Sequence, residues 1–149
     1  MFTNEKIIWR QGKRRIAGVD EVGRGPLSGP VISAAVLIDQ SFYVDGIADS
    51  KKLSKKKREL LYDKIYSKAC AVGIGIVDKF EIDNINILEA TKLSMKKAVD
   101  NLPSKPDYVI VDGRDNPILN YPSHAIIKGD QNSISIASAS IIAKVHRDR

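Results

Sequence analysis

The chain has 149 residues, which suits one domain with a single hydrophobic core. Its 43% hydrophobic and 28% charged residues are typical of a globular protein, and no apolar run approaches the roughly 18–20 residues of a membrane-spanning helix. The single cysteine, Cys70, excludes an internal disulfide, and we expect a packed core thiol rather than a zinc ligand. Because Met1–Lys6 also lacks a secretory signal pattern, we expect a cytoplasmic protein.

The formal net charge of +6 is concentrated in one segment of the chain. Between Asp49 and Lys68 there are eight lysines and arginines against three acids, a net charge of +5. Such a run is either a solvated helix face or a contact surface for a polyanion, and charge alone leaves both open. Since only Tyr62 and Tyr66 accompany the cations, backbone contact with a duplex fits better than a stacking platform for single strands.

The predicted elements alternate between strands and helices behind a loose leader over residues 1–13. Ser54 and the pair Asn86 and Glu89 resemble helix-capping residues. We expect strands over 14–20, 30–38, 69–77, 107–111 and 124–127, and helices over 54–68, 86–102 and 133–147. The expected core residues of the first two helices are Leu60, Leu61, Ile65, Leu88, Met95, Val99 and Leu102. The alternation predicts an α/β domain with a mixed central sheet flanked by helices.

Acidic side chains follow three of the predicted strands. Asp20 and Glu21 end the first, Asp112 ends the fourth, and Asp130 follows the fifth. In α/β sheets, sites gather where loops converge at strand ends. Four convergent carboxylates would repel one another, whereas Mg²⁺ and Mn²⁺ prefer such oxygen ligands. Two such ions, about 3.5–4 Å apart, can clamp the attacking and leaving oxygens of a phosphodiester displacement.

The stretch Gly18–Gly25 carries the first two of these acids. Neighbouring side chains of a regular strand point to opposite faces, so Asp20 and Glu21 share one site only if the strand bends or ends there. The glycines that follow them permit such a bend, and Arg24 adds a planar fork suited to phosphate. The plainer interpretation is a strand that ends in an acidic, glycine-rich loop, and each of the other acids also suits a turn or a helix start.

The motif series as a whole resembles ribonuclease HII. The matching segments, in the family's order and spacing, are Gly18–Gly25, Asp49–Leu53, Val111–Gly113, Lys128–Asp130 and Ala139–Val145. The resemblance implies an RNase H-like fold over residues 14–149 and endonucleolytic cleavage of RNA in RNA–DNA hybrids. It also implies incision at ribonucleotides embedded in duplex DNA, which leaves 5′-phosphate and 3′-hydroxyl ends.

The resemblance also assigns roles to particular residues. The catalytic residues and metal ligands would be Asp20, Glu21, Asp112 and Asp130. The cofactor would be Mn²⁺ or Mg²⁺. The nucleic-acid contacts would be Gly23, Arg24 and Gly25 around the ribose 2′-hydroxyl, with Lys51, Lys52 and Lys144 near phosphates. The partners would be RNA–DNA hybrid and ribonucleotide-containing duplex DNA, with no membrane and no obligate protein partner.

The end of the chain departs from the family pattern, because members of the family continue with a helical C-terminal region. That region carries a tyrosine that stacks at the DNA side of the junction. We therefore expect a C-terminally truncated member whose last helix exposes an apolar patch and favours self-association. The patch would comprise Ile134, Ile141, Ile142 and Val145. Truncation leaves open a weakly active or non-catalytic nucleic-acid-binding fragment, and the fold leaves open a junction-type DNA nuclease.

Overall fold

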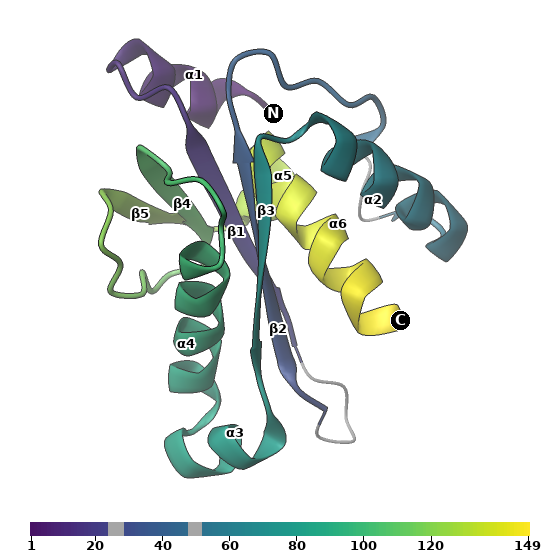
Figure 1. The fold of residues 1–149 in the computed structure, drawn as a ribbon, viewed down its shortest axis with the longest axis vertical. Coiled ribbons are helices and arrows are strands. Elements are labelled where there is room, and N and C mark those ends of the chain that lie inside the picture. The colour runs from purple at the N-terminus through teal and green to yellow at the C-terminus, as the bar shows by residue number, and fades with distance from the viewer. Residues whose placement is uncertain (24–28, 48–51) are drawn as a thin grey trace.

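The centre of the structure is a five-stranded mixed sheet with the order β3-β2-β1-β4-β5 (Figure 1). The computed structural model describes residues 1–23, 29–47 and 52–149. The strands are β1 (Ile16–Val22), β2 (Val31–Ile38), β3 (Ala71–Val77), β4 (Tyr108–Asp112) and β5 (Ser123–Ile126). β2 pairs antiparallel with both β1 and β3, whereas β4 pairs parallel with both β1 and β5. The predicted α/β class with a mixed sheet is confirmed.

Helices cover both faces of this sheet. They are α1 (Thr3–Arg10), α2 (Lys55–Lys68), α3 (Lys79–Ile85), α4 (Ile87–Asp100), α5 (Gly129–Asn132) and α6 (Ile134–Asp148). Helix α6 packs on β1 and β2 with α2 outside it, and α4 packs on the opposite face (Figure 1). Side-chain oxygens of Ser54, Asn86 and Ser133 accept backbone hydrogen bonds at the starts of α2, α4 and α6. The predicted Ser54 and Asn86 caps are confirmed, whereas α3 and α5 were not predicted.

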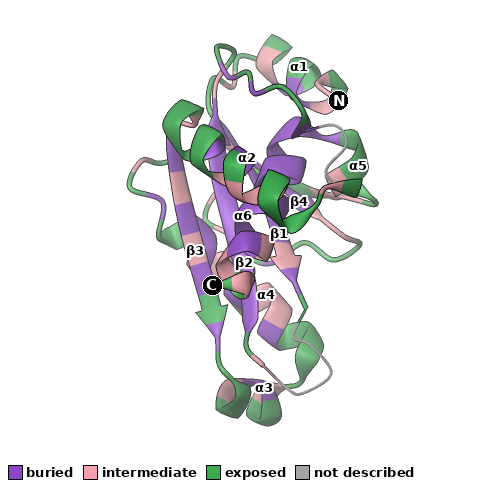
Figure 2. Ribbon diagram, turned by 90° about the vertical axis from the view of Figure 1, so that its right-hand side faces the viewer, coloured by how far each residue is buried: buried purple, intermediate pink, exposed green. Residues whose placement is uncertain are grey.

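The start of α6 lies unusually close to β1. A Cβ atom added to Gly18 would lie 2.2 Å from the carbonyl carbon of Ser135, so only glycine fits at this position of the strand. Small residues such as Ala137 and Ala139 continue this close packing, and both are fully buried. Helix α6 is buried over most of its length (Figure 2). The glycine of β1 and the small side chains of α6 therefore allow the two backbones to pack closely, and this close packing limits how far the two elements can shift.

The predicted apolar patch on the last helix is not exposed. Ile134, Ile141, Ile142 and Val145 are at most 5% exposed, because the sheet covers one side of α6 and α2 covers another. An ion pair between Arg58 and Asp148, with 3.4 Å between nitrogen and oxygen, ties α2 to the end of α6. The expectation of self-association through this patch is wrong for the described structure.

Three other burial predictions are also wrong. Leu60 is 57% exposed because α2 turns Leu61 and Ile65 toward the core instead. Leu88 is 50% exposed in the first turn of α4. Cys70 is exposed between α2 and β3, where its thiol donates a weak 3.6 Å hydrogen bond to Asp39.

None of the helices in the described ranges is long and apolar enough to span a lipid bilayer.

The expected loose leader is instead a helix that joins the core. Within α1, Ile8 is 3% exposed and packs with Ile16 and Ile110 of the sheet and Ile136 of α6. The helix therefore bridges the first strand and the last helix of the described chain. The division into a leader over residues 1–13 and a domain over 14–149 stays a prediction.

Candidate active site

Two acids predicted for the site lie on neighbouring strands. The parallel pairing of β1 with β4 places Val19 beside Val111, so that the next residue on each strand, Asp20 and Asp112, lies at the same point of the sheet. Asp20 is 4% exposed and Asp112 is half-buried. β4 ends at Asp112, whereas β1 continues past Asp20 to Val22.

Glu21 follows Asp20 within a regular strand, opposite Ser33 of β2. The strand thus continues through both acids, and its side chains alternate between the α6 face and the α4 face. Glu21 nevertheless lies close enough to Asp112 for their charges to interact, and among the described residues the β1–β4 pairing ends one residue before Asp20, at Val19. Burial raises the pKa of Glu21, and the negative charge of Asp112 raises it further.

The environment of Asp20 disfavours its ionised form. Burial raises the pKa of Asp20 well above its usual range, and repulsion from Asp112 and then from Glu21 adds to the effect. A hydrogen bond from the Glu21 backbone N–H, 2.8 Å from Asp20 Oδ1, acts in the opposite direction. The three carboxylates therefore lie close enough to repel one another, which is the electrostatic signature of a site that suits a cation.

Asp130 reaches the same region through a tight turn before α6. Lys128 adopts a left-handed conformation with φ of 56°, and the N–H of Gly129 then donates to Asp112 Oδ1 over 2.6 Å. The N–H of Asp130 approaches the same oxygen at 3.4 Å. A Cβ atom on Gly129 would lie 2.5 Å from Ile136 Cδ1, so a larger residue here would require the Ile136 side chain to move. The Asp130 carboxylate forms no hydrogen bond or ion pair with any described residue.

The carboxylates form an oxygen-only donor set, which suits Mg²⁺ or Mn²⁺ rather than a softer metal. Within the described ranges, no three His, Cys, Asp or Glu side chains are already arranged to hold a metal ion. Without a cation, repulsion among the acids opposes bringing their carboxylates together. The assignment of Asp20, Glu21, Asp112 and Asp130 as metal ligands therefore stays a prediction.

The predicted nucleic-acid contacts fall into two groups. Gly23 is exposed just after β1, Lys52 is exposed just before α2, and Lys144 is half-buried on α6. The other three, Arg24, Gly25 and Lys51, lie outside the described residues. Helix α2, with its lysines, lies on the same side of the sheet as α6 (Figure 1). Gly18 of β1 faces α6, and Asp20, two residues further along the strand, lies on the same face of the sheet.

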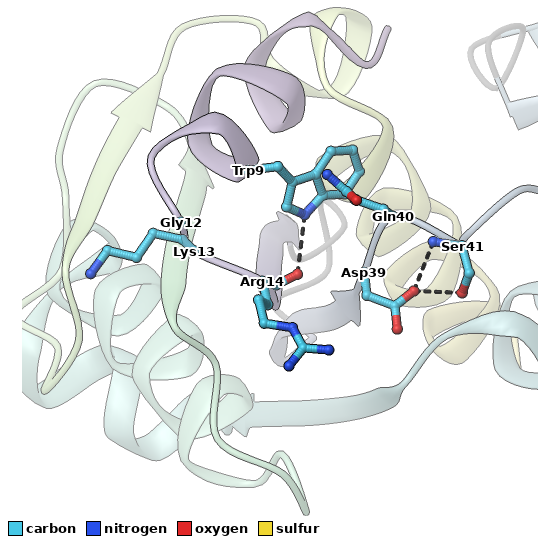
Figure 3. Close-up of a pocket in the computed structure, with 7 residues that line it drawn as sticks. All are labelled: Trp9, Gly12, Lys13, Arg14, Asp39, Gln40 and Ser41. Carbon is cyan, nitrogen blue, oxygen red and sulfur yellow. Dashed lines mark hydrogen bonds between the residues drawn. The ribbon is translucent and has the colours of Figure 1, made fainter.

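A cleft of about 400 Å³ lies at the opposite end of β1, beside Arg14 (Figure 3). The Asp39 carboxylate in this cleft is already engaged by the backbone N–H and the hydroxyl of Ser41. These two hydrogen bonds lower the pKa of Asp39, in contrast to the raised pKa of Asp20. The candidate for metal chemistry is therefore the group of repelling carboxylates near the ends of β1 and β4, and not this cleft.

The comparisons with known proteins give the family of the chain. A family model described as Ribonuclease HII matches residues 17–149, which include all four acids. The chain belongs to the ribonuclease HII family. A ribonuclease HII from Acetivibrio thermocellus is 53% identical over 149 residues, which are 100% of this chain and 58% of that protein. The chain therefore spans a little over half the length of this curated relative.

Solved ribonuclease structures share the fold of this chain. Ribonuclease H2 from Pyrococcus horikoshii OT3 superposes with a TM-score of 0.79 and 31% identity, covering 91% of this chain and 72% of that chain. A PCNA:RNase HII complex from Archaeoglobus fulgidus gives a TM-score of 0.75 with 30% identity, covering 90% and 72%. The RNase H-like fold implied by the sequence motifs is confirmed.

The raised pKa values predict how the metal-free protein responds to pH. Asp20 and Glu21 bind protons more tightly in the folded chain than in the unfolded chain, where their pKa values are about 4. Their ionisation therefore costs folding free energy, and this cost grows as pH rises from about 4 through the raised pKa values. In EDTA, we expect Asp20→Asn to melt above wild type at pH 7, with the difference shrinking toward pH 4.

Asp39→Asn is the control of opposite sign. The pKa of Asp39 is lowered, so its stabilising effect is present above about pH 4 and lost as pH falls through the lowered value. Asp39→Asn should therefore melt below wild type at pH 7. Thermal denaturation across this pH range checks both variants. If Asp20→Asn melted below wild type by a constant margin at every pH, the repulsion described here would be refuted.

Proposed function

We propose that this chain is an endoribonuclease that cleaves the RNA strand of RNA–DNA hybrids and incises at ribonucleotides embedded in duplex DNA. The reaction is a metal-dependent phosphodiester hydrolysis that leaves 5′-phosphate and 3′-hydroxyl ends. The observation that carries the proposal is the buried Asp20 beside Asp112 and Glu21, in a chain of the ribonuclease HII family. Because the chain is shorter than its curated relatives, its own activity is the property to be tested.

The cofactor in this proposal is Mn²⁺ or Mg²⁺, held by Asp20, Glu21, Asp112 and Asp130. The donor chemistry supports it, since every candidate ligand is a carboxylate oxygen and the pKa values of Asp20 and Glu21 are raised by burial and then by like charge. A pair of such cations, when bound, supplies an activated water and stabilises the charge that develops on the phosphodiester.

The chain's own contribution is to hold the acids in fixed orientations. The N–H of Gly129 fixes one oxygen of Asp112, and the N–H of Glu21 fixes one oxygen of Asp20. Both acids stand on paired strands of a packed sheet, which moves less than a loop does. Asp130 is carried by the short turn before α6, and its position depends on what holds that turn.

The substrate contacts follow from the charge distribution and from the family. Exposed lysines on and before α2, such as Lys52 and Lys55, would bind backbone phosphates, and their contribution would weaken as salt concentration rises. Lys144 of α6 and Lys51 would add further phosphate contacts. Gly23, Arg24 and Gly25 would read the ribose 2′-hydroxyl, the group that distinguishes RNA from DNA at a single position.

Three end-labelled nucleic-acid substrates test the proposal in Mn²⁺, in Mg²⁺ and in EDTA. They are an RNA–DNA hybrid, a DNA duplex with one ribonucleotide, and an all-DNA four-way junction. We expect metal-dependent cleavage of the first two, with 5′-phosphate products, and no cleavage of the junction. Binding without cleavage would instead support a non-catalytic nucleic-acid-binding chain. Preferential cutting of the junction would instead support a DNA nuclease on the same fold.

A further inference from the structure

Glu5 of α1 is a fully buried carboxylate that the proposed reaction does not use. Its Oε2 accepts hydrogen bonds from the hydroxyl of Ser133 at 2.5 Å, the hydroxyl of Ser135 at 2.7 Å and the N–H of Ser135 at 3.2 Å. Its Oε1 is buried and finds no hydrogen-bond partner among the described residues. Burying a carboxylate with one unpaired oxygen costs folding free energy, so a carboxylate at this position points to a specific role.

The three hydrogen bonds place Glu5 at the start of α6. The first backbone N–H groups of a helix have no partner within the helix, and a negative charge there is favourable. In α6, the N–H of Ile134 donates to the carbonyl of Met1, the N–H of Ser135 to Glu5, and the N–H of Ile136 to the Ser133 hydroxyl. The first turn of α6 contains no acid of its own. Glu5 supplies a hydrogen-bond acceptor there from another helix.

A chain of hydrogen bonds continues from this point to the candidate metal site. The N–H of Ser133 donates to the carbonyl of Gly129 at 2.8 Å, and the N–H of Gly129 donates to Asp112 at 2.6 Å. Asp130 lies within the turn that these bonds enclose. Asn4, the neighbour of Glu5, adds a hydrogen bond of 3.2 Å to the carbonyl of Asn132. The segment that carries Asp130 is thus fastened to α1 on one side and to Asp112 on the other.

Helix α1 is itself anchored at its other end. The indole N–H of Trp9 donates to the carbonyl of Arg14 at 3.1 Å, just before β1 (Figure 3). Ile8 is buried against the sheet and Ile136. The helix therefore forms a support between the start of β1 and the start of α6. It lies ahead of residue 17, where the match to the family model begins.

We propose that Glu5 is a positioning residue for the metal site. It fixes the start of α6 and, through Ser133 and Gly129, the turn that presents Asp130 beside Asp112. Without Glu5, the turn loses a fixed end, Asp130 samples a wider range of positions, and the affinity for a divalent cation falls. This inference rests on the proposed function only in taking Asp130 to be a metal ligand.

The test compares Glu5→Ala and Glu5→Gln with Val99→Ala as a control that also disturbs the core. Val99 of α4 is buried as well, but it packs in the core on the opposite face of the sheet from α6, with Ala17 and Val109. The readouts are the Mn²⁺ concentration that gives half of the maximal rise in Tm, the Mn²⁺ concentration for half-maximal cleavage, and the KM for an RNA–DNA hybrid.

We expect Glu5→Ala to raise both Mn²⁺ concentrations by about 10–100-fold, the usual range for residues that orient metal ligands, with little change in KM. Glu5→Gln keeps an oxygen for the two serines and should shift less. Val99→Ala should lower Tm and leave the Mn²⁺ dependence unchanged. Hydrogen exchange should rise across residues 129–136 in Glu5→Ala and not in the control.

A loss of Tm in both Glu5 variants, with a Mn²⁺ dependence equal to that of wild type, would overturn the proposal and leave Glu5 a purely structural residue. If Glu5→Ala does not fold, Glu5→Gln decides the question alone by the same comparison. The proposed function fails in a different way, when wild type gains Tm from Mn²⁺ but cuts no hybrid. The effect on the Mn²⁺-induced rise in Tm then still decides the role of Glu5.

Discussion

Asp112→Asn is expected to reduce cleavage of an RNA–DNA hybrid by about 10²–10³-fold or more, the cost typical of losing one group that stabilises charge in the transition state. Asparagine has nearly the same shape and retains an oxygen that can accept the 2.6 Å hydrogen bond from Gly129. The change therefore removes charge from the site without removing the contact that holds the turn. Folding and hybrid binding should persist, because the lysines of α2 are untouched.

Single-turnover cleavage in Mn²⁺ and in Mg²⁺, with hybrid binding measured in parallel, checks this expectation. Asp115→Asn is the matched control, since Asp115 is an exposed acid three residues further along the same chain segment. The control should cleave within a few-fold of wild type. If Asp112→Asn cleaved as fast as Asp115→Asn, Asp112 would have no role in holding the metal.

Gly18→Ala is expected to give the largest loss of stability among simple substitutions near the site. The added Cβ would lie 2.2 Å from the carbonyl carbon of Ser135 and 2.5 Å from the backbone nitrogen of Ile136. Backbone atoms of a buried helix cannot yield cheaply, so β1 and α6 must separate. We expect a loss of about 3 kcal/mol in the free energy of unfolding, at the upper end for overpacked cores.

Thermal and urea denaturation of wild type and variant measure this loss. A loss of this size lowers Tm by about 6–12 °C in a chain of this length. Gly29→Ala is the control, because no other atom of the described residues lies within 4 Å of a Cβ at that position. It should change the stability little. Equal melting of Gly18→Ala and wild type would show that α6 does not dock on β1 as closely as described.

Local signals in the sequence predicted much of the fold. Ser54 and Asn86 were identified as helix caps because a capping side chain and its backbone partner lie three residues apart. The buried strand β2 was recognised from its continuous apolar run. The candidate acids stand out in the sequence because each lies at or shortly after the end of an apolar run. These features are short-range, so a single sequence contains the information needed to find them.

Long-range contacts explain what the sequence could not show. The partners of Glu5 lie 128 and 130 residues away, so the local sequence predicts a loose leader over residues 1–13, whereas Thr3–Arg10 form helix α1 against the core. The isoleucines of α6 looked exposed because nothing local indicates that α2 covers them. The proximity of Asp20 and Asp112 depends on the parallel register of β1 and β4, which the motifs implied but periodicity alone could not fix.

We propose that the carboxylates near the ends of β1 and β4 hold the divalent cation used for cleavage. Anomalous diffraction from crystals of the protein soaked in Mn²⁺ would locate this cation. We expect a manganese peak contacted by the carboxylates of Asp20 and Asp112, and its loss in Asp112→Asn crystals soaked in the same way. A manganese peak only at another place in the protein, or one at these strand ends that is unchanged in the variant, would show that these carboxylates do not hold the cation.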